Sequence, residues 1–338
     1  MKKILTLLLA LWMLTGCVAM AAENQLVVGS TTAMSGAFFT DLFGSNTADM
    51  DVRALLHGYN LMSWDNETGT YQINDSVVAG MAVSKDAQNN RVYTFDLYGD
   101  LKFSDGSAIT AKDYAFSILL TASPELAKLG GQSAAVGAIL GMDAYQSGKS
   151  SVLRGVRLLS DTQMSITISK AYEPYFYEMA LFDYSPYPIS VLAPGCKVVD
   201  TEKGVGIVNA SGTGDALFTA DLLQKTILDA ATGYMSHPSV VSGPYTLTSY
   251  DAQSGTASFA INPYYKGNEE GEKPTIETIV YRSVANDEAI DLLLSGEVDL
   301  LNKMVAADTI SKGIQSTADQ PFSVANYPRS GLSMISFS

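Results

Sequence analysis

Residues 93–117 read YTFDLYGDLKFSDGSAITAKDYAFS, a stretch in which a strand pattern, a turn and a helix start follow one another directly. Apolar and polar side chains alternate up to residue 103, which predicts strands with one buried face. The letters SDG at 104–106 predict a turn. Thr110, followed three residues later by Asp113, predicts a capped helix with an apolar stripe behind the cap. The side chains expected in the core are Tyr93, Phe95, Leu97, Leu101, Phe103, Ala115, Phe116, Leu119 and Leu120.

This order resembles the signature of the extracellular solute-binding proteins of family 5, the peptide and nickel receptors of bacterial ABC importers. KFSDG at 102–106 and TAKD at 110–113 carry the likeness. Later segments are similar to further motifs of the family and keep its order: VSGPYTL at 241–247, ASFAINPYY at 257–265, and a helix pattern that ends in SGEVDL at 295–300. The resemblance runs from about residue 26 to the end of the sequence.

The resemblance implies an α/β protein of the periplasmic-binding-protein type II fold, a two-lobed clamp with a mixed sheet in each lobe and an extra subdomain in lobe I. On this basis we assign residues 24–58 and 176–300 to lobe I, 59–175 to its small subdomain, and 301–338 to the beginning of lobe II. Family chains continue well beyond residue 338, so we expect a C-terminally truncated chain that lacks most of lobe II. Residues 199–236 fit the family least, and we expect a variable insertion there with a short helix at 220–230.

The N-terminus has the pattern of an export signal. Two lysines precede an apolar run at 4–14, which is shorter than the roughly 20 residues of a membrane-spanning helix. We predict a lipoprotein signal peptide over 1–16, because LTGC at 14–17 resembles a lipobox in which Cys17 would be lipidated. Lipid would anchor the protein to the outer face of the bacterial cytoplasmic membrane. The alternative is ordinary cleavage after AMA at 19–21, which leaves a soluble periplasmic protein. The type of envelope stays open.

Composition limits the classes of function. The sequence has 35 acidic and 21 basic residues, a formal net charge of −14, which disfavours nucleic-acid binding. With 338 residues and 47% hydrophobic composition, the chain can bury a sizeable core. Only Cys17 and Cys196 are present, so lipidation or cleavage leaves no intramolecular disulfide, and we expect Cys196 to be a small buried or loop residue. We expect a monomer without a cofactor.

Support for catalysis or for a resident metal is poor. No Gly-x-Ser-x-Gly elbow, His-Glu-x-x-His pair or P-loop occurs, and the two histidines, His57 and His237, lack any accompanying motif. We interpret both as structural. Asp41, Asp49 and Asp51 lack the glycine and the terminal glutamate of a calcium loop and are better interpreted as acids at a helix start. Nickel and haem receptors occur in the family, so a metal complex stays open as cargo.

The resemblance also suggests cleft positions. It places the segment before the first helix at the cleft, where a peptide could add a strand, although the same residues would also serve as turn formers. Two positions in the small subdomain and three near the end of the sequence are similar to others that line the cleft. The candidate ligand-binding residues are Gly44, Ser45, Asn46, Val136, Gly137, Ser330, Gly331 and Leu332.

The resemblance to family 5 implies a non-enzymatic receptor that captures oligopeptides between two lobes and delivers them to the ABC permease subunits in the membrane. Ligand-stabilised closure would be the mechanism, with no chemistry. Two alternatives stay open: a sensory or scavenging receptor with the same clamp, and a secreted hydrolase. The ligand is undetermined, because receptors for oligopeptides, dipeptides, oligosaccharides and metal chelates share these motifs.

Overall fold

The computed structural model describes residues 24–44, 46–132, 137–173, 175–317 and 322–325, and it confirms the predicted α/β class. The strands are β1 (Gln25–Ser30), β2 (Met62–Asp65), β3 (Thr70–Ile73), β4 (Val78–Lys85), β5 (Arg91–Leu97), β6 (Val156–Leu158), β7 (Gln163–Ile168), β8 (Cys196–Thr201), β9 (Gly204–Asn209), β10 (Tyr245–Asp251), β11 (Thr256–Ile261), β12 (Thr278–Ser283) and β13 (Leu300–Asn302). The α-helices are α2 (Thr47–Leu56), α3 (Ala111–Thr121), α4 (Pro124–Lys128), α5 (Met142–Gln146), α6 (Ile189–Leu192), α7 (Ala220–Ile227), α8 (Ala289–Ser295) and α9 (Ala307–Thr317). Two 3₁₀ turns are η1 (Lys170–Tyr172) and η2 (Glu178–Phe182).

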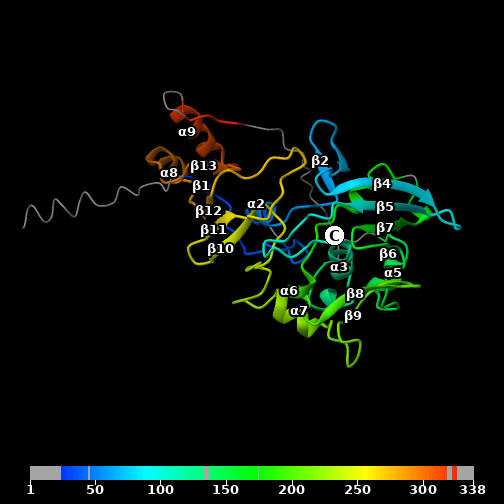
Figure 1. Ribbon diagram of the computed structural model, residues 1–338. Coiled ribbons are helices and arrows are strands. Elements are labelled where there is room, and N and C mark those ends of the chain that lie inside the picture. The colour runs from blue at the N-terminus through cyan, green and yellow to red at the C-terminus, as the bar shows by residue number, and fades with distance from the viewer. Residues whose placement is uncertain (1–23, 45, 133–136, 174, 318–321, 326–338) are drawn as a thin grey trace, which may run out of the picture.

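The stretch at 93–117 folds as the strand, turn and helix that its pattern predicts. The five side chains of this stretch that are expected in the core, Tyr93, Phe95, Leu97, Leu101 and Phe103, are buried, whereas Tyr98 is 38% exposed. Gly106 has φ +84° in the turn, a backbone conformation that glycine adopts without strain. Thr110 and Asp113 form the expected capping box. The helix differs from prediction in one respect, because nearly every side chain of α3 is buried and not only one stripe. Figure 1 shows the reason: α3 runs between the sheet of β4, β5 and β7 and the β8–β9 hairpin.

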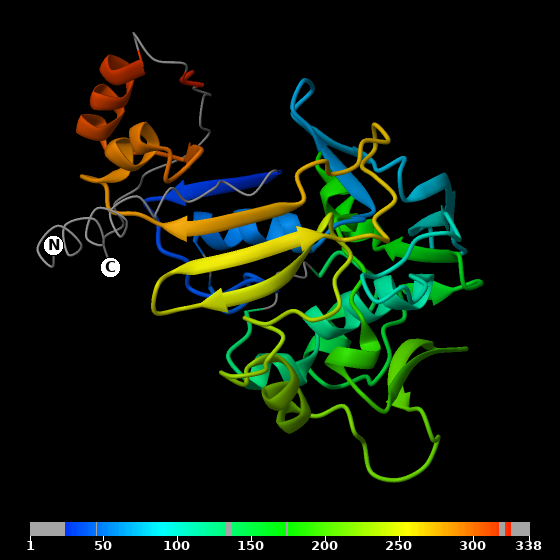
Figure 2. The same ribbon diagram turned by 60° about the vertical axis from the view of Figure 1, so that its left-hand side comes forward.

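A five-stranded mixed sheet forms the other half of the fold, in the order β10-β11-β12-β1-β13. Strand β1 is parallel to both β12 and β13, while β10, β11 and β12 are antiparallel to one another. Helix α2 covers one face of the sheet (Figure 2), where Val52 and Leu56 pack with Phe259 and Tyr281. In the chain, the carboxyl end of β1 is followed by the loop at 31–46 and then by α2.

A four-stranded antiparallel sheet, β4-β5-β7-β6, forms the second half. We expect strand β7 to be half-buried from the alternation of Met164, Ile166 and Ile168 with polar residues. The structure corrects this expectation, since Ser165 and Thr167 are also buried, at 4% and 8% exposure. Strand β7 is an interior strand, with β5 paired along one edge and β6 along the other. The burial of Ser165 and Thr167 shows that other segments of the chain also cover the second face of the sheet at this point.

The hydrophobic core of this second half continues past residue 175, where the assignment above places a subdomain boundary. Phe182, Val205 and Tyr234 belong to the same cluster as Phe95 and Phe116. The helix expected at 220–230 is present as α7, and Cys196 is buried in β8, where burial raises the pKa of its thiol.

At the other end, β13 pairs with β1 as an edge strand of the mixed sheet, α8 contacts β13, and α9 packs on α8. Within the described part of the chain, no helix is both long and apolar enough to cross a bilayer.

Candidate functional site

A hollow of about 240 Å³ opens beside the loop that connects β1 to α2. It lies between the loop at 40–42, the side of α3 that carries Ser117 and Thr121, Ile139, and the segment 180–187. Four separate parts of the chain therefore build it. A second hollow of about 690 Å³ lies between α4, α5 and the segment 207–218, away from the positions that the sequence suggests for a ligand.

Gly44 and Gly137, two of the predicted ligand-binding residues, lie next to the first hollow. The amide of Gly44 donates a hydrogen bond of 2.8 Å to the carbonyl of Asp41, which lines the hollow. Gly137 precedes the lining residue Ile139 by two positions, and a Cβ added to it would lie 2.7 Å from Asp143 Oδ1 and 3.0 Å from the Tyr172 hydroxyl. No larger side chain fits at Gly137 without moving these groups.

Asn46, the third predicted residue that the structure describes, caps helix α2. Its Oδ1 accepts hydrogen bonds of 3.0 Å from the amides of Ala48 and Asp49, and its Nδ2 donates one of 2.8 Å to the carbonyl of Ala33. The side chain is thus engaged in the local turn, as the turn-former interpretation expects. The other candidates lie outside the described residues: Ser45, Val136, Ser330, Gly331, Leu332 and the lipidation residue Cys17.

Asp183 is a lining residue that the sequence analysis misses. Its Oδ1 accepts a hydrogen bond of 2.7 Å from Asn60 Nδ2, and Ser185 Oγ donates one of 2.7 Å to Asn60 Oδ1. These two bonds assign the orientation of the Asn60 amide, because only its nitrogen can donate to the carboxylate. Burial raises the pKa of Asp183, and the bond from Asn60 offsets part of that rise. A carboxylate within the otherwise apolar and aromatic sequence ALFDYSPY, at 180–187, is the signal that points to it.

An aromatic cluster lies behind the hollow. The ring of Tyr187, which lines it, packs edge-on against Phe39 at 4.7 Å, and Phe39 packs against Tyr234 at 4.9 Å. Burial raises the pKa of Tyr187 to about 12, so its phenol is neutral and can donate a hydrogen bond at physiological pH.

His57 belongs to this cluster and is structural, as expected. Its Nε2 lies 3.0 Å from the carbonyl of Phe38, so Nε2 must carry the proton. Burial lowers the pKa of His57 to about 4, despite that hydrogen bond. The imidazole is therefore neutral and points at a backbone carbonyl. His237 lies elsewhere, 6.4 Å from the ring of Tyr250.

The three acids that cluster in sequence near α2 separate in space. Asp49 completes the capping box and accepts a 2.6 Å hydrogen bond from Ser35 Oγ, so its interpretation as a helix-start acid is correct. Asp51 instead pairs with Lys303, beyond β13, and accepts a 2.9 Å bond from the Tyr281 hydroxyl. Asp41 lines the hollow and belongs to no helix. Among the described residues, no group of three His, Cys, Asp or Glu side chains is arranged to hold a metal ion.

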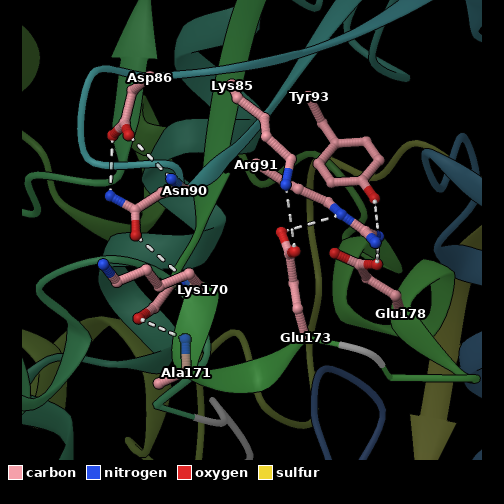
Figure 3. A network of polar contacts seen from close by, with 10 residues as sticks. Lys85, Asp86, Asn90, Arg91, Tyr93, Lys170, Ala171, Glu173 and Glu178 are labelled. Carbon is pink, nitrogen blue, oxygen red and sulfur yellow. Dashed lines mark hydrogen bonds and ion pairs between the residues drawn. The ribbon is translucent and has the colours of Figure 1, made fainter.

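An ion-pair network fixes the segment that leads to the hollow (Figure 3). Arg91 on β5 pairs with Glu178, and its Nε lies 2.9 Å from Glu173 Oε1. Lys85 on β4 lies 3.5 Å from Oε2 of the same Glu173. The two glutamates stand on either side of three exposed aromatic residues at 175–177, of which Phe176 is 82% exposed. The network holds both ends of this aromatic loop against the four-stranded sheet.

The sequence matches a known family over most of its length. The family model described as bacterial extracellular solute-binding proteins, family 5 Middle, matches residues 76–338. The oligopeptide-binding protein OppA of Lactococcus lactis subsp. lactis (strain IL1403) is 28% identical over 233 residues, which are 68% of this chain and 32% of that protein. The periplasmic oligopeptide-binding protein OppA of Escherichia coli (strain K12) is 33% identical over 111 residues, which are 32% of this chain and 20% of that protein.

Solved structures agree on the fold. Lactococcal OppA complexed with an endogenous peptide in the closed conformation has a TM-score of 0.62 at 20% identity, with 87% of this chain and 48% of that chain covered. Listeria monocytogenes OppA bound to peptide has a TM-score of 0.59 at 17% identity, with coverages of 88% and 49%. The chain spans about a third of the curated Lactococcus lactis relative and about half of the two solved chains.

These likenesses confirm the predicted fold class, the mixed α/β fold of periplasmic binding proteins. The match over residues 76–338 shows that the chain belongs to the bacterial extracellular solute-binding proteins of family 5.

Proposed function

We propose that this chain captures oligopeptides outside the cytoplasm for delivery to the permease subunits of an ABC importer. The observation that carries the proposal is the place of the hollow beside the loop that follows β1, a strand that runs parallel to both of its neighbours. In open α/β sheets, ligands bind outside the carboxyl ends of the strands. The relatives named above are peptide-binding proteins, which favours peptide over other solutes.

Members of family 5 are solute-binding receptors and not enzymes, so membership excludes the secreted-hydrolase alternative. For the mechanism, we propose that a peptide bound at the hollow stabilises a closed arrangement with a second lobe, and that this arrangement engages the permease. Export through a signal peptide at 1–16 and a lipid on Cys17 would keep the receptor close to its permease at the membrane surface.

Isothermal titration calorimetry with the purified full-length protein, in which a second lobe can close on the ligand, tests the proposal. We expect saturable binding of a mixture of tri- to pentapeptides, and no binding of free amino acids, maltooligosaccharides or nickel–histidine chelates at the same concentrations. Absence of peptide binding, or stronger binding of a sugar or chelate, would contradict the proposal.

A pair of matched variants links binding to the hollow. Ala180 lines the hollow, whereas Ala127 is exposed on α4. Ala180→Phe should fill part of the space and weaken peptide binding at least about tenfold, which corresponds to 1.4 kcal/mol. Ala127→Phe adds the same side chain to an exposed helix and should leave peptide binding unchanged. Equal affinity of both variants would place the peptide elsewhere.

A further inference from the structure

We propose that the hollow selects peptides that carry a basic side chain, so that a lysine or arginine residue of the ligand occupies it. This inference rests on the proposed function, because it names the class of peptide that the same site takes.

The size of the hollow suits a single side chain. Pockets that enclose a whole small ligand measure roughly 300 to 1,000 Å³, whereas this hollow measures about 240 Å³. The backbone of a bound peptide would therefore lie across its mouth, beside Gly44 and Gly137. Only one residue of the ligand would enter, and its chemistry would decide the selectivity of this subsite.

The walls match a long side chain with an apolar stem. Leu42, Ile139 and Leu181 provide aliphatic contacts, and Tyr184 and Tyr187 add aromatic rings. Lysine and arginine bury their methylene groups along such surfaces and keep the charged end in polar surroundings. A cation near the face of a tyrosine ring gains a further attraction.

The charged groups that line the hollow favour a ligand side chain with a cationic end over one with a neutral end. Two carboxylates, Asp41 and Asp183, line the hollow, and no lysine, arginine or histidine of the described chain does so. Arg53 on α2 is a cation that acts electrostatically on Tyr187 together with both carboxylates. Its Nη1 donates a hydrogen bond of 2.8 Å to the carbonyl of Ala37. Arg53 is thus oriented by the loop at 31–46 and lies outside the lining.

Asp183 is held in place to receive a donor. The side chain of Asn60 donates a hydrogen bond to Asp183 Oδ1. Asn60 is in turn held by Ser185, which bonds to its side-chain oxygen, and by Asn74, whose Nδ2 donates a hydrogen bond of 2.9 Å to the backbone carbonyl of Asn60. The carboxylate is therefore positioned before any ligand arrives, which lowers the entropy lost on binding. The raised pKa of Asp183 agrees with a partly buried carboxyl for which no cation contributes to the shift.

Tetrapeptides of alanine with one variable residue test the inference. The variable residue is lysine, norleucine or glutamate, placed in turn at each of the four positions, and the dissociation constants are measured by calorimetry at pH 7.5. At one position at least, we expect the lysine peptide to bind about tenfold more tightly than the norleucine peptide, a difference of 1.4 kcal/mol, and the glutamate peptide to bind weakest.

Two variants assign the preference to the carboxylates. Asp183→Asn removes the charge but keeps an oxygen that can accept a hydrogen bond from Asn60, so it should reduce the preference for the lysine peptide over the norleucine peptide to about twofold. Asp41→Asn changes an exposed loop residue and should reduce the preference in the same direction, which keeps the test valid if the first variant folds poorly. The control is Asp287→Asn, at an exposed position beside α8, and it should keep the wild-type preference.

The outcomes separate the inference from the proposed function. Equal binding of lysine and norleucine peptides at every position overturns the inference and leaves peptide capture intact, as does a lysine preference that survives both Asp183→Asn and Asp41→Asn. Absence of binding by all of the peptides overturns the proposed function itself.

Discussion

Replacing His57 with glutamine tests whether a buried neutral imidazole makes this fold sensitive to acid. The pKa of His57 is about 4 in the folded protein, lowered from 6.5 by burial. A group with a lowered folded pKa contributes stability that is present above pH 6.5 and is lost as the pH falls towards 4, because the unfolded chain takes up the proton first. Glutamine removes this titration, and its side-chain amide can still donate to the carbonyl of Phe38.

The magnitude follows from the two pKa values. At pH 7.5, both states hold a neutral imidazole and protonation contributes almost nothing. At pH 5, the unfolded chain is almost fully protonated and the folded chain is almost wholly neutral, which favours unfolding by about 2 kcal/mol. The free energy of unfolding of His57→Gln, relative to wild type, should therefore rise by about 2 kcal/mol between these two pH values.

Urea unfolding followed by circular dichroism at pH 7.5 and pH 5 measures this difference. Asp113 titrates in the same range with the opposite sign, since burial raises its pKa to about 6 and so stabilises the folded state as the pH falls. That contribution is present in both proteins and cancels in the comparison. His237→Gln removes the other histidine and is the control. The reasoning is refuted if His57→Gln keeps the wild-type pH dependence, or if His237→Gln abolishes it.

Two further substitutions test local features of the fold. Asn46→Ala removes the cap of α2 and should lower the free energy of unfolding by about 1 kcal/mol, as measured by urea unfolding at pH 7.5; an unchanged midpoint would mean that the cap is not needed. Gly243→Ala places a Cβ 2.5 Å from the carbonyl oxygen of Leu55, against backbone that cannot give way easily, and should destabilise the protein by about 3 kcal/mol. Thermal unfolding measures that loss, and a melting temperature equal to wild type would contradict the close approach of the two segments.

Much of the fold can be predicted from the sequence because the relevant interactions are local. The alternation before residue 103, the glycine turn and the capping box of Thr110 each depend on residues at most four positions apart or on a period of two. Helix α8 stops at Gly296, which has φ +77°, for the same kind of local reason. Burial on the second face of β7 and around the whole of α3 could not be predicted, because it depends on which distant segments cover them.

In the candidate site, too, some features follow from local sequence patterns and others depend on distant segments of the chain. Gly44 and Gly137 can be proposed as ligand-binding positions from their resemblance to family motifs, and they stay a prediction. Asp183 could not be proposed in this way, because its partner Asn60 lies 123 positions away in sequence. By itself, the sequence determined the α/β class, the decisive strand-turn-helix segment and the family motifs, since these are written in short-range patterns. Only the tertiary structure decided which carboxylates share a hollow, because burial and charge at that point arise from four segments that meet only when the core has packed.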